Sequence, residues 1–296
     1  MLSILIPIYN FNTLPLVKIL QEQAEKISIP YEIICLNDAS TQFLDDNKKM
    51  QEIPNVRYEF LNHNIGRSKI RNLLARQAQY DWLLFVDADI IPKSDQFIAN
   101  YVAQINHEIK AVNGGIIYSE NKPEQNKLLR WVYGKSRESL PVEARNKNPY
   151  LSFLTLNFLI HKSIFEKIRF DETIPNLRHE DTLFSYTLKQ HNVAVKHIDN
   201  PVYHIGLDNF ENAMRKENES LYALKNLLDQ QLLPPDYIKI SKVFSSLKKM
   251  KMVYFMKLFH DSTRFIFQKN LASAHPSLFI FDLYRLGYLC KLDTQN

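Results

Sequence analysis

The amino-acid sequence predicts an α/β fold: a mainly parallel sheet flanked by helices, followed by a helical C-terminal extension. Three observations predict it. Short apolar runs of strand character alternate with amphipathic segments of about 10 to 16 residues through roughly the first two-thirds of the chain. Polar clusters directly follow several of these runs. Beyond Asn209 the apolar periodicity is helical to the end, interrupted at Pro234-Pro235 and Pro276.

The expected elements follow in order along the chain. Apolar runs rich in β-forming residues predict strands at 3–9, 31–36, 56–61, 82–86, 111–118 and 193–198. Apolar residues at helical spacing predict helices after Asn12-Thr13, at 68–79, at 97–105 and after Asp181. The polar stretch 120–150 predicts a mobile loop with a short helix near 128–133.

Composition sets broad limits on the class of protein. The chain has 296 residues, 45% hydrophobic and 23% charged, which is ordinary for a soluble protein with a large core. Cys35 and Cys290 lie far apart, so we expect free thiols in a reducing compartment. The first strand begins at once, and no run of about 18 apolar residues occurs. We therefore expect no signal peptide, no membrane span and a cytoplasmic location.

The sequence Asp87-Ala88-Asp89 carries the strongest chemical signal. It ends a strand-like apolar run with two carboxylates, and burying a carboxylate is costly unless a cation or hydrogen bonds compensate it. Mg²⁺ and Mn²⁺ are typically held by one or two carboxylates and substrate phosphates. The alternative is that these aspartates only cap the strand and its turn.

Three polar clusters are expected at one edge of the sheet. Tyr9-Asn10, Asn37-Asp38 and Asp87-Ala88-Asp89 each follow a predicted parallel strand. Ligands of such sheets bind beyond the carboxyl ends of the strands. The six glycines form neither a dinucleotide-binding turn nor a Walker-type loop, so a nucleotide must be held in another way.

These segments together resemble glycosyltransferase family 2, with the nucleotide-diphospho-sugar transferase (GT-A) fold. The resemblance runs from Ser3 to about Gly206 and rests on motifs in register. They are Ser3-Ile4-Leu5-Ile6-Pro7-Ile8-Tyr9-Asn10, Asn37-Asp38-Ala39-Ser40, Asn64-Ile65-Gly66-Arg67-Ser68-Lys69-Ile70-Arg71-Asn72, Asp87-Ala88-Asp89 and Glu180-Asp181. We accordingly expect a catalytic domain at 1–208 and a helical, basic extension at 209–296.

The resemblance implies a function and a set of site residues. It implies an inverting, metal-dependent transfer of a sugar from a nucleotide-diphospho-sugar, with UDP-sugar expected, to a hydroxyl of a glycan or lipid-linked acceptor. Asp181, with Glu180 beside it, is expected to supply the general base. Mn²⁺ or Mg²⁺ is expected on Asp89, with Asp87 and His204 as further ligands. Nucleotide-sugar contacts are expected from Pro7, Tyr9, Asn10, Asp38, Gly66, Arg71, Asp87 and Ala88.

Each of these residues also has a structural interpretation. Glu180 and Asp181 can simply favour a helix N-terminus, and Asp38 can stabilise a turn. Arg71 can point to solvent, and Tyr9 can be a core aromatic. A lone histidine such as His204 is commonly structural.

The chain also departs from the family pattern. Leu154-Thr155-Leu156-Asn157-Phe158 replaces small residues on the acceptor side, and Ile168-Arg169-Phe170-Asp171 replaces Gly-Gly-Phe-Asp. The Gln-x-x-Arg-Trp motif of processive polymerases is missing after His191, which indicates transfer of a single sugar. Two other functions compete with this one. A sugar nucleotidyltransferase should have a Gly-rich basic loop early in the chain, and this sequence has none. The other is a non-catalytic relative that serves as a binding or scaffolding protein.

Residues 239–269 form a basic, apolar segment with eight cations and a single acid, Asp261. Two interpretations are open. The segment is either a helical cap packed on the catalytic domain with a solvated basic face, or an amphipathic helix in peripheral contact with the inner face of a membrane. Nucleic-acid binding is not expected, because no recognised module accompanies the charge.

Overall fold

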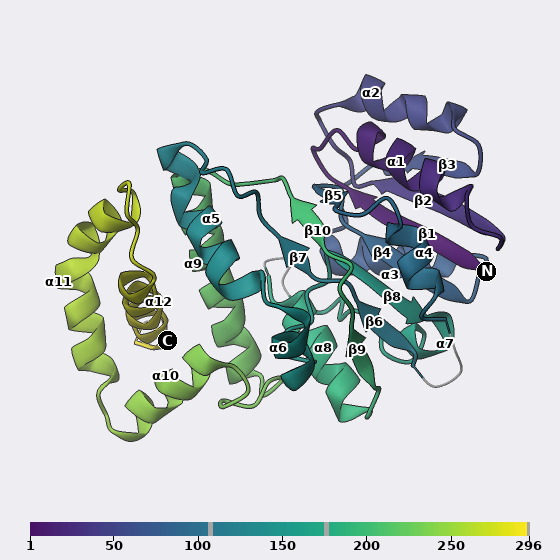
Figure 1. The fold of residues 1–296 in the computed structure, drawn as a ribbon. Coiled ribbons are helices and arrows are strands. Elements are labelled where there is room, and N and C mark those ends of the chain that lie inside the picture. Colours follow the sequence, from purple (N-terminus) through teal and green to yellow (C-terminus); the bar gives the residue numbers. More distant parts are fainter. Residues whose placement is uncertain (106–108, 175–177, 295–296) are drawn as a thin grey trace. The chain divides into compact units, whose positions relative to one another are not determined.

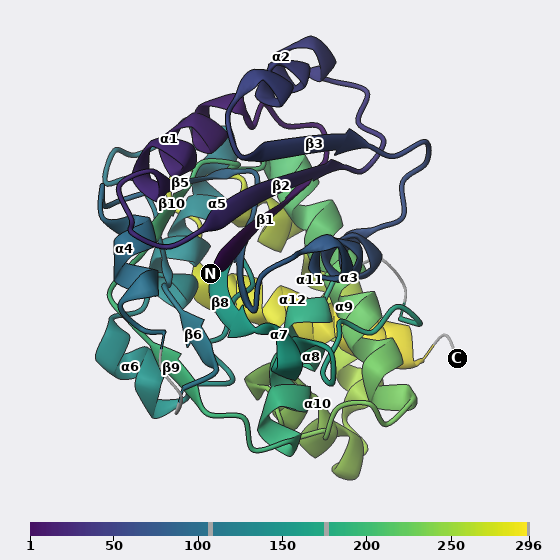
Figure 2. The ribbon, with the colours of Figure 1, turned by 90° about the vertical axis from the view of Figure 1, so that its right-hand side faces the viewer.

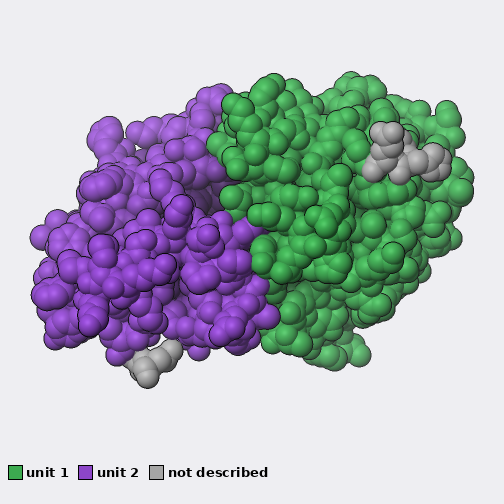
Figure 3. All heavy atoms as spheres, turned by 90° about the horizontal axis from the view of Figure 1, so that it is seen from below, with its two compact units in different colours: residues 1–118, 139–176, 180–206 green, residues 119–138, 177–179, 207–296 purple. Residues whose placement is uncertain are grey.

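The computed structural model describes residues 1–105, 109–174 and 178–294. It divides into two units, each with its own internal packing (Figure 3). The sheet unit contains Met1–Tyr118, Ser139–Asn176 and Glu180–Gly206. The helical unit contains Ser119–Glu138, Leu177–His179 and Leu207–Asn296. The domain boundary expected between residues 208 and 209 stays a prediction.

A seven-stranded sheet forms the centre of the sheet unit (Figures 1 and 2). β1 pairs in parallel with β2 and β4, β2 with β3, and β6 with β9, whereas β8 runs antiparallel to β4 and β6. The expected mainly parallel α/β sheet is confirmed. Its strands, in spatial order, are β3 (Val56–Phe60), β2 (Tyr31–Asn37), β1 (Leu2–Ile8), β4 (Trp82–Val86), β8 (Asn157–His161), β6 (Ala111–Asn113) and β9 (Val195–His197).

The central strand β1 shows why this order suits the sequence. All its residues except Pro7 are buried, as expected for a parallel strand covered on both faces. Its pairing with β4 covers only Leu2 to Leu5, and Pro7 lies beyond it. Proline donates no backbone hydrogen bond, so the end of β1 is a position where it is tolerated.

Alternate side chains of the strands form two apolar cores, one on each face of the sheet. Ile4, Ile6 and Leu84 pack in one core with α1 (Leu14–Ala24) and α4 (Phe97–Val102). Leu5, Leu83 and Phe85 pack in the other with α3 (Arg67–Gln77), α7 (Lys162–Phe165) and α8 (Glu180–Gln190). The helices therefore cover both faces, as the alternation in the sequence indicates.

A second, three-stranded sheet was not foreseen from the sequence. It consists of β5 (Ile90–Pro92), β10 (Val202–His204) and β7 (Ile116–Ile117), with β10 in the middle. The strand predicted at 111–118 is divided between the two sheets. Its break falls at Gly114-Gly115, where Gly115 has a φ of 90° and a side chain on Gly114 would collide with Asn157 and Asn200.

Several other expectations need correction. The stretch 120–150 is not simply a loop, since it contains η2 (Gln125–Lys127), the expected short helix α5 (Leu128–Tyr133), η3 (Gly134–Glu138) and α6 (Val142–Lys147). An unpredicted helix α2 (Leu44–Lys48) continues into η1 (Lys49–Glu52). Thr13 is the N-cap of α1, but its side chain makes no capping bond. Its backbone N–H instead donates to Asn47 Oδ1 at 2.9 Å.

The helical unit is formed by α9 (Phe210–Asp229), α10 (Lys239–Lys249), α11 (Val253–Leu271) and α12 (Leu278–Asp293), together with α5. α12 contacts both α9 and α11. Their core includes Leu129 of α5, Met214 of α9, Leu271 of α11 and Phe281 of α12. The breaks expected at Pro234-Pro235 and Pro276 are confirmed, because these prolines fall between helices. None of the helices in the described part of the chain is long and apolar enough to cross a membrane.

Phe85 gives a test of the sheet unit's core. Its ring is buried and stacks on Phe158 and Phe165 at centroid distances of 4.8 and 5.1 Å. We expect Phe85→Ala to lower the free energy of unfolding by about 3 to 5 kcal/mol, since it removes apolar contacts and leaves a cavity. Phe60→Ala, at the half-exposed end of β3, is the control and should cost about 1 kcal/mol or less. Equal losses measured by denaturant unfolding would contradict this description of the core.

Candidate functional site

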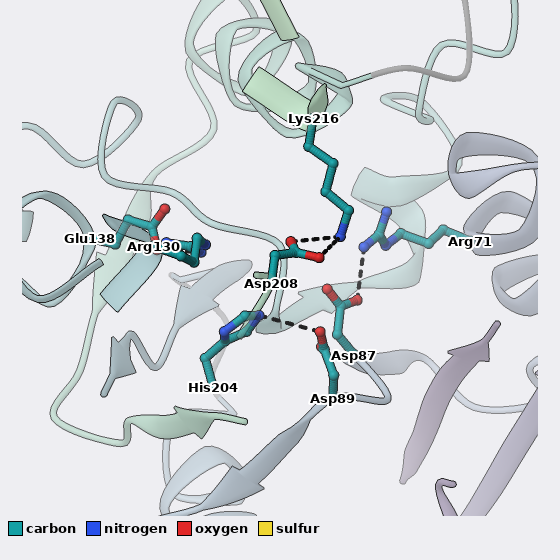
Figure 4. A network of polar contacts seen from close by, with 8 residues as sticks. All are labelled: Arg71, Asp87, Asp89, Arg130, Glu138, His204, Asp208 and Lys216. Carbon is teal, nitrogen blue, oxygen red and sulfur yellow. Dashed lines mark hydrogen bonds and ion pairs between the residues drawn. The ribbon is translucent and has the colours of Figure 1, made fainter. Parts of the chain in front are cut away.

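The acidic turn joins the two sheets of the sheet unit. β4 ends at Val86 and β5 begins at Ile90, so Asp87-Ala88-Asp89 is the connection between them. β10 pairs with β5 in the register that sets His204 opposite Ile90, one residue beyond Asp89. The Ile205 N–H also donates to the Asp89 carbonyl at 3.0 Å. As a result, Asp89 Oδ2 and His204 Nε2 lie 3.3 Å apart (Figure 4).

Gly206 allows this close approach, and sequence reasoning did not single it out. A Cβ on Gly206 would lie 2.5 Å from Asp89 Oδ2, so any other residue would displace the carboxylate. Burial opposes ionisation of Asp89, but the hydrogen bond and charge of His204 outweigh it and lower the pKa of Asp89. The sequence did offer one indication of this role: the chain has only six glycines, and Gly206 comes two residues after the candidate ligand His204.

Asp89 and His204 fit a divalent cation better than the expected set of three ligands does. Their facing atoms have a spacing close to the separation of about 3 Å between adjacent ligands in an octahedron with bonds of roughly 2.1 Å. His204 Nδ1 is buried without a hydrogen-bond partner. No cluster of three or more His, Cys, Asp or Glu side chains arranged for a metal occurs among the described residues. Further ligands would have to come from diphosphate oxygens and water, as is usual for such ions.

Asp87 faces a different partner. Its Oδ1 accepts a 2.8 Å hydrogen bond from Arg71 Nη2, while Arg71 Nη1 donates to Glu180 Oε1 at 3.4 Å. Arg71 comes from α3 and Glu180 from the first turn of α8, so one guanidinium links the end of β4 to two helices. The Arg71 side chain is only 6% exposed, which excludes the solvent-facing interpretation. Phe170 lies under the guanidinium, 5.4 Å from Arg71 Cζ to the ring centroid.

The electrostatics of this group follow from burial and pairing. Burial by itself would lower the pKa of Arg71, but Asp87 and Glu180 more than offset it, so the guanidinium stays charged. Burial raises the pKa of Asp87 and Arg71 opposes that rise. Glu180 is buried and also pairs with a second cation, Arg67, at 3.5 Å.

Asp181 lies beside Glu180 at the start of α8. Its Oδ1 accepts the backbone N–H of Thr182 at 2.6 Å and the Thr182 hydroxyl at 3.3 Å. Burial and the neighbouring Glu180 raise the pKa of Asp181 to about 6. Such a carboxylate is still ionised at neutral pH, yet it accepts a proton more readily than an ordinary aspartate does.

Asp38 connects two turns at the same edge of the sheet. It follows β2, and its two oxygens accept the backbone N–H groups of Ile65 and Gly66 at 2.7 and 3.0 Å. Asn64 donates to the Asp38 carbonyl at 3.1 Å. Gly66 has a φ of 86° and is the N-cap of α3, so this turn fixes the start of the helix that carries Arg71. Asp38 thus stabilises these turns, and its contact with the nucleobase of a donor stays a prediction.

The exit of β1 completes this edge. Tyr9 is 57% exposed, which excludes the core-aromatic interpretation and leaves its ring free to stack on a ligand. Asn10 has a φ of 51°; its N–H donates to Ser40 Oγ and its Oδ1 accepts from the Thr41 N–H, both at 2.8 Å. The turns after β1 and β2 are therefore held together. The nucleotide contacts expected of Pro7, Tyr9, Asn10, Gly66, Arg71 and Ala88 stay predictions.

Comparison with known sequences gives two findings. A sequence model of the family described as "Glycosyl transferase family 2" matches residues 3–169. A protein of Haemophilus influenzae (strain ATCC 51907 / DSM 11121 / KW20 / Rd), described as an uncharacterized glycosyltransferase, is 23% identical over 189 residues. That alignment covers 62% of this chain and 70% of the relative.

Three solved structures resemble the fold. The mannosyltransferase PcManGT from Pyrobaculum calidifontis, in complex with GDP-Man and Mn²⁺, has a TM-score of 0.52 at 13% identity, covering 77% of this chain and 64% of that one. S. aureus TarS 1-349 in complex with UDP has a TM-score of 0.52 at 16% identity, and the match covers 99% of this chain and 91% of that one. Mannosyl-3-phosphoglycerate synthase from Rubrobacter xylanophilus has a TM-score of 0.54 at 12% identity, and the match covers 81% of this chain and 80% of that one. At these identities the likeness shows the fold.

Arg71 provides a test of the ion network. We expect Arg71→Met to lower the free energy of unfolding at neutral pH by about 3 to 5 kcal/mol, because Asp87 and Glu180 would lose their buried counter-ion. Arg76→Met, on the same helix, is the matched control. Arg76 is half-exposed and lies 3.7 Å from Glu172, so its loss should cost about 1 kcal/mol or less. Similar denaturation midpoints for the two variants would show that the Arg71 pairs contribute little.

Proposed function

The chain belongs to glycosyl transferase family 2 and has the GT-A fold, and from this membership we propose a reaction for it. It transfers one sugar from a nucleotide-diphospho-sugar, with a UDP-sugar as the favoured donor, to an acceptor hydroxyl with inversion at the anomeric carbon. The observation that carries the proposal is the arrangement along α3. Its N-cap, Gly66, is bonded by Asp38, and its Arg71 bonds Asp87 and Glu180. One helix thereby connects three positions: Asp38, proposed to contact the nucleobase; Asp87, two residues before the proposed metal ligand Asp89; and Glu180, next to the proposed general base Asp181.

Donor binding is assigned to the edge formed by the exits of β1, β2 and β4. Tyr9 offers an exposed ring for stacking on the base, and each oxygen of Asp38 has a lone pair left for a donor group of the base. UDP as the carrier is supported by the TarS complex, whereas PcManGT holds GDP-Man. We favour UDP because the Asp38 turn resembles the family's uracil-contacting turn.

Proton transfer is assigned to Asp181. Its carboxylate removes the proton of the acceptor hydroxyl as that oxygen forms a bond to the anomeric carbon and the bond to the diphosphate breaks. The nucleoside diphosphate leaves on the opposite side, so a single displacement inverts the configuration. The hydrogen bonds from Thr182 fix one carboxylate oxygen, and this orients the other for the acceptor. Glu180 is a positioning residue, since it contacts Arg71 and Arg67.

A divalent cation, Mn²⁺ or Mg²⁺, would be held by Asp89 and His204, with Asp87 reaching the ribose or a bound water. When bound, the ion neutralises the charge that develops on the leaving diphosphate. A Mn²⁺ complex among the solved relatives supports this assignment. Gly206 and the β5–β10 pairing hold Asp89 and His204 together before any ligand arrives.

The proposal also includes an acceptor and a cellular location. We assign the acceptor to a glycan or a lipid-linked oligosaccharide in cell-surface glycan assembly, with residues 1–208 as the catalytic domain. A cytoplasmic setting, with peripheral contact to the inner face of the membrane through residues 239–269, agrees with two buried, free cysteines. No role in nucleic-acid binding is assigned.

Incubation with labelled UDP-, GDP- and dTDP-sugars in the presence of Mn²⁺ tests the proposal as a whole. Release of the nucleoside diphosphate by slow donor hydrolysis is the expected result, even without the acceptor. If no donor were hydrolysed and none raised the melting temperature, the proposed reaction would be wrong. Pyrophosphate exchange instead of hydrolysis would assign the site to nucleotidyl transfer.

Asp89 tests the cation site. Asp89→Ala should abolish metal-dependent UDP binding in calorimetry while the fold is kept, because half of the proposed protein ligand pair is lost. Asp95→Asn, an exposed aspartate shortly after β5, is the control and should bind like the parent chain. Unchanged affinity in Asp89→Ala would remove this residue from the metal site.

Asp181 tests the base. Asp181→Asn should keep donor affinity and lose transfer by about 10² or more, as expected when a general base is removed. In the parent chain, transfer should decline as the pH falls through about 6, since protonated Asp181 cannot accept the acceptor's proton. This decline can be measured as the acidic side of a profile of kcat/KM against pH. Near-normal turnover of the variant, or a profile that is flat around pH 6, would shift the role to another group.

A further inference from the structure

Helix α11 carries its large apolar side chains on the outside. The side chains of Tyr254, Phe255, Leu258, Phe259, Phe265 and Ile266 are all exposed, and at 62% and 68% Phe265 and Ile266 are among the most exposed. These positions recur at helical spacing on one side of the helix, with the exposed Ser262 between Phe259 and Phe265, and are here called the α11 stripe. The opposite face, with His260, Phe267 and Leu271, is buried.

The packing of the helical unit explains why the stripe is left uncovered. α12 lies between α9 and α11, so α11 is an outer layer that uses one face for the core (Figure 1). Its other face is turned away from α12 and remains in water. Leaving several large side chains in water costs free energy, and exposed apolar patches of this kind usually mark an interaction surface.

The charges near the stripe are mostly positive, although Lys248 pairs with Asp293 of α12 at 2.9 Å. Exposed lysines lie along α10, in the turn that follows it and at the end of α11: Lys239, Lys242, Lys248, Lys249, Lys251 and Lys269. The single acid between residues 239 and 269 is Asp261, which lies 3.2 Å from Lys257 and 3.3 Å from Lys291. Met250 and Met252 are also exposed and join the lysines to the stripe.

The segment differs from both structures expected of it. It is not a single amphipathic helix, because α10 and α11 are separated by a break at residues 250–252, where Lys251 has a φ of 58°. The solvated basic face expected of a cap is present, but large apolar side chains are solvated beside the lysines, which that interpretation did not include.

We infer that the α11 stripe docks on an anionic lipid bilayer, with its aromatic and aliphatic side chains in the interface and the lysines of α10 at the phosphate groups. A helix that presents apolar residues on one face and is bordered by cations binds such interfaces through buried apolar area and attraction to anionic lipids. This inference rests on the membrane contact proposed above for residues 239–269 and specifies it, because it names the side chains that enter the interface and the charge of the lipid they meet. It concerns a different unit from the donor site, and lipid binding can be measured without sugar transfer.

Charge complementarity favours a lipid surface over a second copy of this chain. Two copies meeting through the same stripe would bring their lysine borders together, and like charges repel. An anionic bilayer offers the opposite charge over a flat area, and each lysine near it contributes roughly a fivefold gain in affinity.

Sedimentation of the full 296-residue chain with lipid vesicles tests the inference. We expect binding to vesicles of phosphatidylcholine mixed with phosphatidylglycerol, weak binding to phosphatidylcholine alone, and release by added salt. Phe265→Ser with Ile266→Ser should weaken binding by about tenfold or more, because the most exposed apolar area is removed. Replacing Lys242, Lys249 and Lys269 by Gln should weaken it by about fivefold per lysine.

Leu151→Ser is the matched control, since Leu151 is an exposed apolar residue of the sheet unit and should leave vesicle binding unchanged. Failure to bind the anionic vesicles, or equal binding to both lipid mixtures, would overturn the inference. A concentration-dependent dimer that Phe265→Ser with Ile266→Ser dissolves, without lipid binding, would assign the stripe to self-association. Donor hydrolysis should be unaffected by these variants, so the proposed reaction and the proposed lipid binding can fail independently of each other.

Discussion

The buried guanidinium of Arg71 is the constraint on which the arrangement of the site depends. It bonds Asp87 after β4 and Glu180 at the start of α8, and its own helix begins at the turn held by Asp38. Removing two carboxylates from water is tolerated because Arg71, backed by the Phe170 ring, pairs with both and Arg67 adds a second cation beside Glu180. Three segments that are distant in sequence are thereby fixed at one sheet edge. Side chains held by such partners keep their geometry before a ligand binds, which a transfer reaction requires.

Much of this fold could be predicted from the sequence. The strands around β1 are continuous apolar runs, and the helices between them have one apolar face, so the period of the pattern distinguishes them. The family resemblance placed Asp38, Asp87, Asp89 and Asp181 after strands or at a helix start, where the structure has them. Shorter elements were missed for a physical reason. β5, β7 and β10 have only two or three residues each, too few to show a period.

The pairing of Asp89 with His204 illustrates what local patterns cannot give. Their contact depends on the register of β10 against β5 and on the missing side chain of Gly206, and both are long-range features. The role of Arg71 was likewise ambiguous, because a cation on a helix gives no sign of its own burial. The α11 stripe could not be predicted as exposed either, for a different reason. Its sequence has the apolar period of a packed helix, and only the position of α12 decides which face is covered.

The same ion network also bears on the chemistry of Asp181. Arg71 pairs directly with Asp87 and Glu180, and its charge affects Asp181 less than the charge of the adjacent Glu180 does. Desolvation and that neighbour raise the pKa of Asp181 to about 6, against the lowering effect of Thr182 and Arg71. The pairing of Glu180 with the arginine therefore leaves Asp181 under the combined effect of burial and an acidic neighbour, and both effects favour its proposed role as proton acceptor.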